Sequence, residues 1–388
     1  MRIINRLADR FGSVRPLPEG IHHRRGMLPG KVPYRLHLRL RKDGSGLLIV
    51  NASTVLDLNP TGAEFAFHFV GGAEPEAAAR QVAGRYQIGK AAALEEYRDF
   101  TGKLEALLSL PDLDPVADLG FERANPRSAD LTAPLRLDCA LTYRLPRGTR
   151  PDRAPVKRVK RELDTDEWKA VLDSAWRVGV PHVTFTGGEP TLRPDLAELV
   201  AHAESNGQVC GLLTDGLRFV NRRYFDTLLQ AGLDHVLIVL QPTAATAWRA
   251  VAAVVKADIS ATVHLTLRPN RRKAAGEALN KLARAGIRSV SLSASAASLS
   301  ADLGELRNRA SELGLSLKWD LPVPYSEMNP VATETSGENP RPGAGRAWLY
   351  VEPDGDVLPS QGAADRVLGN ILQDGWEKIY PPSASSSA

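Results

Sequence analysis

Two glycines, a glutamate and a proline follow an apolar run in the middle of this 388-residue chain: Gly187, Gly188, Glu189 and Pro190. Glycine has no side chain and tolerates positive φ, so a ligand can approach the backbone closely at such a turn. A carboxylate beside that backbone can accept the hydrogens of an amino group. The string therefore predicts a site for an amino-bearing ligand, with Glu189 as its first candidate.

A second acidic turn follows the next apolar run, at Asp215. In sheets of parallel strands, ligands bind at the carboxyl ends of the strands, where such turns meet. Two carboxylates within reach of each other can perform general acid–base catalysis. Glu189 and Asp215 are therefore our catalytic candidates.

Alternating strands and helices position these turns. Apolar runs that read as strands lie at 135–143, 182–186, 209–213, 235–240, 261–267 and 289–292. Amphipathic stretches that read as helices separate them, and short connections of this kind imply a parallel sheet covered by helices. We expect an α/β fold whose main body, residues 135–324, is a partial (β/α)6 TIM-like barrel.

The flanking segments predict smaller modules. Residues 1–42 hold eleven Arg or Lys against two acidic residues, and we expect 1–32 to be a basic flexible arm. Residues 33–110 read as strands at 34–41 and 47–56 followed by three helices, a winged-helix-like α+β domain. We expect linker 111–134, a hairpin-bearing extension at 325–380, and a disordered tail at 381–388.

Composition excludes several classes of protein. The chain contains only two cysteines, Cys139 and Cys210, which rules out a disulfide framework and any site needing three thiolates. No apolar run approaches the roughly 18 residues that span a bilayer. We expect a cytoplasmic protein.

The second half resembles the radical S-adenosylmethionine (SAM) superfamily, in its SPASM/twitch-type peptide-modifying branch. The resemblance covers about residues 135–380 and rests on the strand Leu135–Arg144, the Gly187–Pro190 string, the turn Leu213–Gly216 and the coda Arg346–Pro359. It implies that Gly187–Pro190 receives the amino group of SAM. It also implies further cofactor contacts at Thr214, Asp215 and Gln241.

The chain departs from that family at its cluster motif. The family pattern CxxxCxxC holds a 4Fe–4S cluster, and in register those positions are Leu145, Thr149 and Asp152. Clusters need thiolates, so we expect no metal and no 4Fe–4S cluster, and we name no cofactor beyond a possible SAM. Glu189 would then be a relic that caps local backbone donors.

The first domain resembles the PqqD-like fold, called the RiPP recognition element, on the string Ser53–Phe67 and the helix Pro75–Tyr86. That resemblance implies a peptide partner, a leader or precursor that adds as a strand to a sheet edge against the last helix. We place the edge near Leu47–Leu56. A second candidate surface is the basic loop, residues 147–161, which is a cationic mouth for a phosphate or an acidic peptide, or else a solvated loop.

We therefore expect a pseudoenzyme, a non-catalytic accessory that binds a peptide and a cysteine-complete radical SAM partner in RiPP-type maturation. One alternative is a SAM-binding or otherwise active enzyme that uses the barrel cleft, through cluster-independent chemistry or unusual ligation. A second is a nucleic-acid binder using the basic arm 1–42 and the basic loop. Its lack of interleaved aromatic residues counts against it.

Overall fold

The computed structural model describes residues 14–28, 32–110, 113–123, 131–319, 321–329 and 343–381. The chain divides into two compact units, Met1–Ser128 and Ala129–Ala388. Residues 1–13 of the expected arm, 111–112 and 124–130 of the expected linker, and 382–388 of the expected tail lie outside the described residues. Within the described part, no helix is both long and apolar enough to span a membrane.

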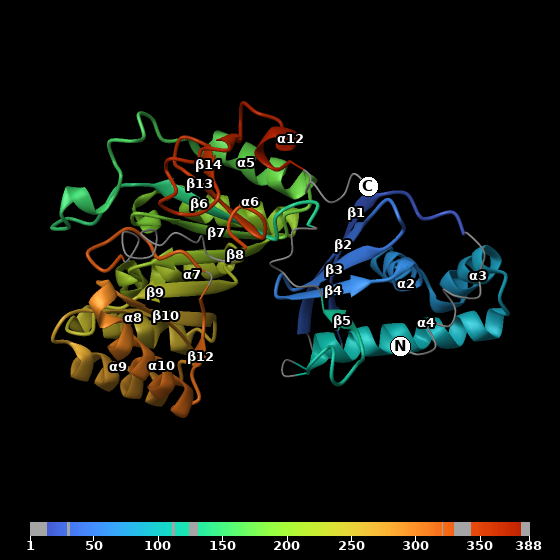
Figure 1. Cartoon of the computed structure of the whole chain (residues 1–388), viewed down its shortest axis with the longest axis horizontal. Helices are drawn as coiled ribbons and strands as arrows, with labels where there is room; N and C mark the ends of the chain where they lie inside the picture. The colour runs from blue at the N-terminus through green and yellow to red at the C-terminus, as the bar shows by residue number, and fades with distance from the viewer. Residues whose placement is uncertain are drawn as a thin grey trace. The chain divides into compact units, whose positions relative to one another are not determined.

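The first unit is a five-stranded antiparallel sheet with three helices against one face (Figure 1). Its strands run in spatial order as β1 (Gly20–Leu28), β2 (Val32–Leu40), β3 (Gly46–Val50), β4 (Thr54–Leu58) and β5 (Glu122–Arg123). Its helices are α2 (Pro60–Val70), α3 (Pro75–Tyr86) and α4 (Lys90–Ser109). The three expected helices are thereby confirmed to within a few residues.

Alternation along β2 and the start of α2 explain how this unit folds. Leu36, Leu38 and Leu40 alternate with polar residues along β2 and pack into the core shared with the helices. Asn59 caps α2 by accepting a hydrogen bond from the Gly62 amide, and a proline occupies the first turn, where its missing amide costs nothing. The helices therefore begin where the strand pattern ends.

Two features of this unit differ from expectation. Residues 20–28 form the edge strand β1, because every residue from Gly20 to Leu28 pairs with β2, whereas we expected a flexible arm there. The single expected strand Leu47–Leu56 is two strands, because Asn51 and Ala52 both adopt positive φ and reverse the chain. As a consequence β3 lies inside the sheet, so the part of the expected Leu47–Leu56 edge that belongs to β3 is not an edge, whereas its last residues lie in β4, beside the short strand β5.

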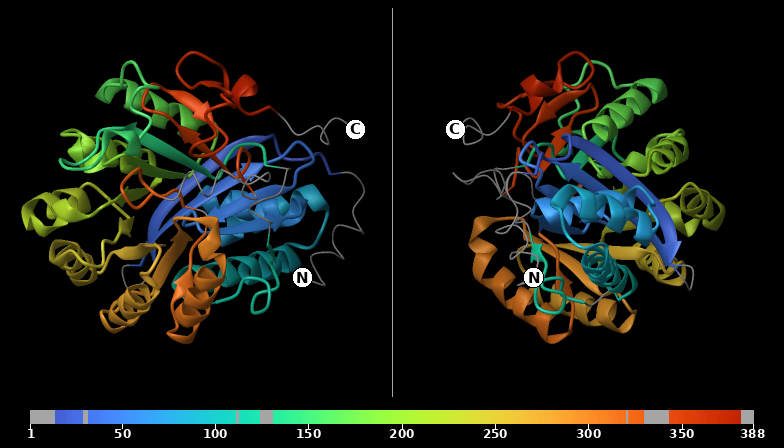
Figure 2. Two further views of the ribbon diagram at one scale, coloured as in Figure 1. Left: turned by 60° about the vertical axis from the view of Figure 1, so that its left-hand side comes forward. Right: turned by 90° about the vertical axis from the view of Figure 1, so that its right-hand side faces the viewer.

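The second unit contains one ten-stranded sheet. In spatial order its strands are β12 (Ser316–Leu317), β11 (Ser289–Ala294), β10 (Ser260–Leu267), β9 (His235–Val239), β8 (Val209–Thr214), β7 (His182–Gly187), β6 (Arg136–Thr142), β13 (Trp348–Val351), β14 (Asp356–Leu358) and β15 (Gly369–Asn370). The strands from β6 to β12 pair in parallel with their neighbours. A helix follows each strand from β6 to β11, and Figure 2 shows these helices along one side of the sheet.

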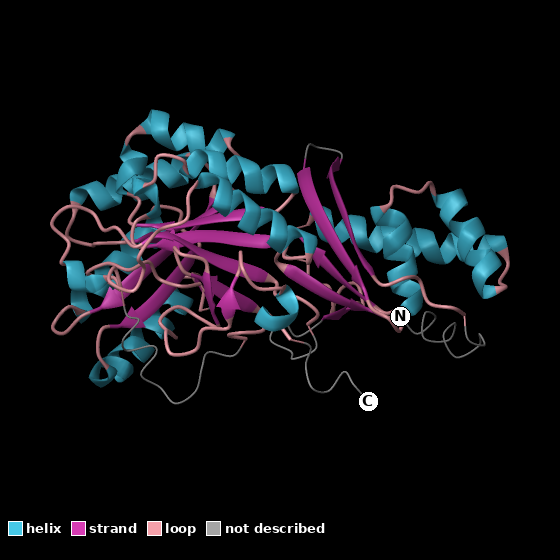
Figure 3. Ribbon diagram, turned by 90° about the horizontal axis from the view of Figure 1, so that it is seen from above, coloured by secondary structure: helices cyan, strands magenta, loops and turns pink. Residues whose placement is uncertain are grey.

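These helices follow from capping signals and apolar stripes. They are α5 (Thr165–Arg177), α6 (Leu196–Asn206), α7 (Arg222–Gln230), α8 (Ala245–Lys256), α9 (Arg272–Arg284) and α10 (Ser300–Glu312). Asp164 and Glu167 form a capping box at the start of α5, and Gly207 ends α6 in the left-handed conformation. The expected β/α alternation is confirmed, and Figure 3 shows the helices packed around the strands.

The C-terminal hairpin is part of the main sheet, which we did not expect. Strands β13 and β14 form the expected antiparallel hairpin, but β13 also pairs in parallel with β6. The short helix α12 (Trp376–Ile379) follows. Residues from both ends of this unit therefore share one core.

We predict that Phe65→Ala destabilises the first unit by about 3–5 kcal/mol, because the removed ring leaves a cavity in a packed core. Phe65 is 1% exposed and contacts the rings of Tyr97 and Phe100. Hydrogen exchange of the α2 amides in the full chain measures the effect. Leu110→Ala, at a side chain that is 52% exposed, serves as the control and should leave that exchange unchanged.

Candidate functional site

The Glu189 carboxylate lies at the end of β7 and joins it to the end of β8. Its Oε1 accepts hydrogen bonds from the Thr191 amide at 3.0 Å, the Thr191 hydroxyl at 2.6 Å and the Thr214 hydroxyl at 2.7 Å. Its Oε2 accepts one from the Asp215 amide at 2.9 Å. The side chain is almost fully buried. We call Gly187, Gly188, Glu189, Thr214 and Asp215 the strand-end site.

Glu189 and Asp215 are two neighbouring carboxyl groups with raised pKa values. Burial, together with the neighbouring Asp215 charge, raises the pKa of Glu189 to about 7. Burial also raises the pKa of Asp215, whose main-chain amide donates a hydrogen bond to Glu189. At neutral pH the pair therefore holds a proton close to a half-buried surface, as an acid–base catalyst requires.

The two glycines leave room for the chain's own backbone rather than for a ligand. A Cβ atom on Gly187 would lie 2.3 Å from the Thr142 carbonyl oxygen, and one on Gly188 would lie 2.3 Å from the Arg144 carbonyl oxygen. Gly187 also has a φ of +120°. Close ligand approach was our expectation, but here the end of β6 and the residues just after it approach the glycines.

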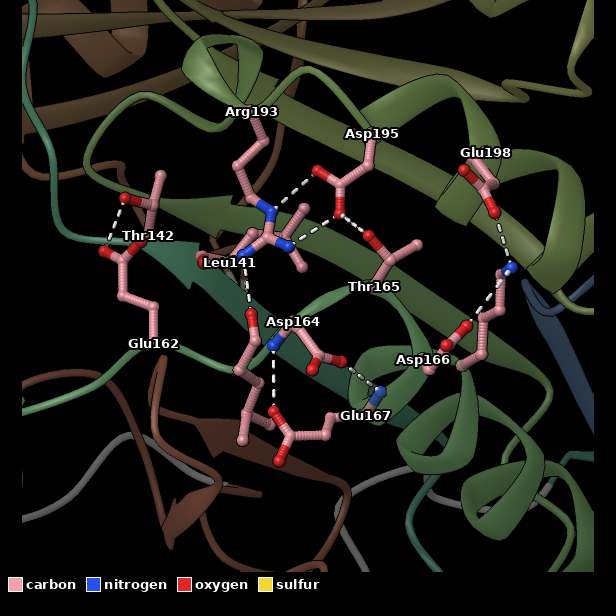
Figure 4. Close-up of polar contacts among 12 residues, drawn as sticks. Leu141, Thr142, Glu162, Asp164, Thr165, Asp166, Glu167, Arg193, Asp195 and Glu198 are labelled. Atoms are coloured by element: carbon pink, nitrogen blue, oxygen red, sulfur yellow. Dashed lines mark hydrogen bonds and ion pairs between the residues drawn. The ribbon is translucent and has the colours of Figure 1, made fainter.

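Polar contacts hold together the two ends of the loop between β6 and α5 (Figure 4). Glu162 accepts hydrogen bonds from the Thr142 hydroxyl at 2.6 Å and from the Tyr143 amide at 3.0 Å. The buried Arg193 guanidinium donates to the carbonyl oxygens of Leu141 and Leu163, and so holds both ends of the loop. It also makes a two-pronged ion pair with Asp195, at 2.9 and 2.6 Å.

Four cations of the basic loop are paired with carboxylates, which favours the solvated loop over the cationic mouth among the two alternatives. Arg150 and Arg153 both contact the Glu327 carboxylate, at 3.3 and 3.2 Å. Arg158 lies 2.5 Å from Glu352 and Arg161 lies 2.7 Å from Glu167. The remaining basic residues of the loop are Arg147, Lys157 and Lys160.

The thiols and the loop do not fit an iron–sulfur cubane. Cys139 in β6 and Cys210 in β8 are both buried, with β7 between their strands. Burial raises the pKa of the Cys139 thiol well above its usual value, which disfavours the thiolate that a cluster requires. Three residues stand where the family has the cysteines that bind the iron–sulfur cluster. Leu145 packs against hydrophobic side chains that include Tyr143, Thr149 is half-buried, and Asp152 is exposed.

The structure brings most of the expected site residues together. Thr214 and Asp215 contact Glu189 directly, but Gln241 has an exposed side chain beyond β9 and is not among the Glu189 partners. Sequence reasoning missed Thr191, whose amide and hydroxyl both bind Glu189. A hydroxyl two residues after a buried acid is the signal that was available.

Comparison with known proteins places the chain in a family. Residues 139–244 match the model of the radical SAM superfamily. A PqqA peptide cyclase of Streptomyces rochei is 30% identical over 288 residues, which are 66% of this chain and 78% of that protein. The chain belongs to the radical SAM superfamily.

Other relatives match over shorter regions. A PqqA peptide cyclase of Rhodopseudomonas palustris is 48% identical over 85 residues, which are 22% of each protein. The one from Bradyrhizobium diazoefficiens is 42% identical over 110 residues, which are 28% of this chain and 29% of that protein. The chain thus aligns with less than a third of either relative's length.

Solved structures show that the fold is shared over nearly the whole chain. Streptococcus suis SuiB bound to S-adenosylmethionine matches with a TM-score of 0.58 at 16% identity, over 91% of this chain and 89% of that one. SuiB bound to its precursor peptide SuiA matches with a TM-score of 0.58 at 13% identity, over 96% and 90%.

These findings correct our expectation of function. We expected a non-catalytic accessory, but the relatives that align with this chain carry the name of an enzyme, PqqA peptide cyclase. The pseudoenzyme interpretation is therefore wrong. An active enzyme, the alternative left open by the sequence, agrees better with these relatives.

We predict that Glu189→Gln removes a pH dependence of stability. Because the folded pKa of Glu189 is raised to about 7, the folded state binds this proton more tightly than the unfolded state. Its contribution is complete below about pH 4.5, the usual pKa of glutamate, and is lost as pH rises through 7. The wild type should lose up to about 3 kcal/mol more than the variant between pH 4.5 and 8. Urea unfolding at several pH values measures this, and parallel pH profiles would contradict it.

We predict that Gly187→Ala disrupts the strand-end site, because the new methyl group meets the Thr142 carbonyl and φ is positive there. The melting temperature should fall by several degrees, which corresponds to a loss of about 2–3 kcal/mol or more in the free energy of unfolding. Gly276→Ala in α9 is the matched control, because a Cβ there meets no atom within 4 Å. Equal melting temperatures for the two variants would rule out this close approach.

Proposed function

We propose that this chain is a peptide-modifying enzyme of the radical SAM superfamily that works at the strand-end site. The observation that carries the proposal is the contact of Glu189 with Asp215 at the carboxyl ends of neighbouring parallel strands. The relatives named PqqA peptide cyclase support a peptide as the substrate class.

Glu189 and Asp215 supply the proton chemistry in this proposal. The four donors around Glu189 fix its carboxyl group, and a pKa of about 7 lets it hold or release a proton under ordinary conditions. Asp215 is less buried than Glu189 and passes the proton to and from the substrate. Catalysis of this kind needs no iron–sulfur cluster, which the thiols of this chain do not fit.

SAM is the cofactor that we propose for the same site. Its amino group suits the Asp215 carboxylate, and its neighbours would be Gly187, Gly188, Glu189, Pro190 and Thr214, with Gln241 at the rim. When bound, the cofactor supplies an activated sulfonium carbon. The solved SuiB structure with S-adenosylmethionine, which shares the fold, supports this assignment.

We further propose that the first unit is a PqqD-like element that recognises the peptide by strand addition at β4. Among the described residues its partner β5 pairs only with Leu56 and Asp57, which leaves Thr54, Val55 and Leu58 for a longer strand. The last helix lies nearby, because Phe100 in α4 contacts Phe121 next to β5. Support comes from the fold shared with SuiB bound to its precursor peptide. In this proposal the second unit is a partial barrel with a twitch-like extension.

The test combines the full chain with SAM and PqqA peptide. We expect calorimetry to detect SAM binding and mass spectrometry to detect a SAM-dependent change in the mass of the peptide. Glu189→Gln should lower the rate at least about 100-fold, because it removes the proton donor.

Glu198→Gln in α6 is the control, because this exposed carboxylate pairs only with the surface residue Lys169 among the contacts described. It should retain the wild-type rate. A Glu189→Gln rate equal to that of the wild type, or no SAM binding, would refute the assignment. Iron and sulfide counting on the same material tests the statement that no cubane is held.

A further inference from the structure

The segment Leu321–Asn329, which we call the strap, crosses the carboxyl ends of the central strands without forming a helix or strand. The Tyr325 amide donates a hydrogen bond to the Gly187 carbonyl at 2.7 Å, at the end of β7. The Thr266 hydroxyl, near the end of β10, donates to the Met328 carbonyl. The main chain of the strap thus uses hydrogen-bonding groups at the ends of β7 and β10.

Apolar side chains of the strap fill the space above β8 and β9. Val323 and Met328 are buried, and Leu321 is half-buried. They pack against three side chains from the ends of those strands: Leu213, Leu237 and Val239. These three residues point to the inside of the sheet, where a ligand of the family fold would lie. The strap therefore covers the apolar wall of the site.

Charged side chains hold the strap in place. The Glu327 carboxylate accepts hydrogen bonds from the Arg150 amide at 3.2 Å and from the Arg153 guanidinium at 3.2 Å. Arg268 donates to the Glu327 main-chain carbonyl. The side chains of Arg150, Arg153 and Glu327 are 58%, 37% and 30% exposed, so solvent weakens these ion pairs. Such contacts can be broken at small cost.

One polar group beneath the strap lacks a partner. The Thr186 hydroxyl is buried, and no described residue hydrogen-bonds to it. Thr186 pairs with Ala140 across β7 and β6, and Ala140 packs in the cluster that includes Tyr325. Side chains of paired residues lie on the same face of a sheet, so this hydroxyl lies on the face that the strap covers. A buried hydroxyl without a partner is unfavourable, and a polar ligand at this place would satisfy it.

We propose that the surface beneath the strap is a docking site for an extended peptide. In the free chain the strap occupies this site, and the peptide displaces it. The Gly187 carbonyl would accept from the amide of the peptide, while Thr266 and Arg268 would donate to its carbonyls. Apolar side chains on the peptide would contact Leu213 and its neighbours. The proposal deepens the proposed function, because it names the substrate class as an extended segment with alternating apolar side chains.

The first test weakens the strap without removing it. Glu327→Gln keeps the shape of the side chain but removes its charge, so exchange of the Tyr325 amide in the full chain should accelerate about tenfold. Glu312→Gln in α10, which breaks an exposed pair with Arg309, is the control and should change nothing at Tyr325. Unchanged exchange at Tyr325 in Glu327→Gln would overturn the proposal.

The second test supplies the strap as a separate molecule. A fluorescein-labelled peptide of sequence Leu-Pro-Val-Pro-Tyr-Ser-Glu-Met-Asn is titrated with wild type and with Glu327→Gln, and anisotropy is measured. The peptide should bind the variant at least about fivefold more tightly, because its own strap competes less. A scrambled peptide of the same composition should not bind.

Equal binding to both proteins, or binding of the scrambled peptide, would overturn the proposal. Neither test uses SAM or turnover, so a failed turnover assay with intact strap results would refute only the proposed function. The reverse outcome, turnover without displacement of the strap, would refute only the proposal that the strap covers a docking site.

Discussion

The second unit depends on one buried carboxylate. Glu189 ties the end of β7 to the end of β8 through donors on Thr191, Thr214 and Asp215. Removing a charge from water is costly, and here four hydrogen bonds and a raised pKa reduce that cost. One carboxyl group therefore both holds the strand ends together and sets the charge of the site.

The loop between β6 and α5 shows how polar contacts can organise a segment that the family organises with metal. Arg193 and Glu162 hold its two ends together, and Arg158 joins it to Glu352 after β13. These contacts link parts of the chain that lie far apart in sequence. They give the loop a defined path although no thiolate lies in it.

Local patterns predicted much of this fold. A few neighbouring residues determine the strand ends at Gly187 and Thr214 and the capping box at Asp164. The contact of Arg150 with Glu327 spans 177 positions and leaves no periodic signal, so sequence reasoning could not decide between a cationic mouth and a solvated loop. The paired turn at Asn51 and Ala52 was missed because neither residue is glycine. Function was misjudged because the missing thiolates were weighed above the retained acidic pair.

The two native thiols have a practical consequence. Cys139 and Cys210 are both inaccessible, and the high pKa of the first keeps it protonated. Maleimide reagents attack exposed thiolates, so a cysteine introduced on the surface would be modified ahead of both. Spectroscopic labels can thus be attached at chosen positions without first deleting the natural sulfhydryls, and the motions of this molecule are open to direct observation by distance-sensitive fluorescence.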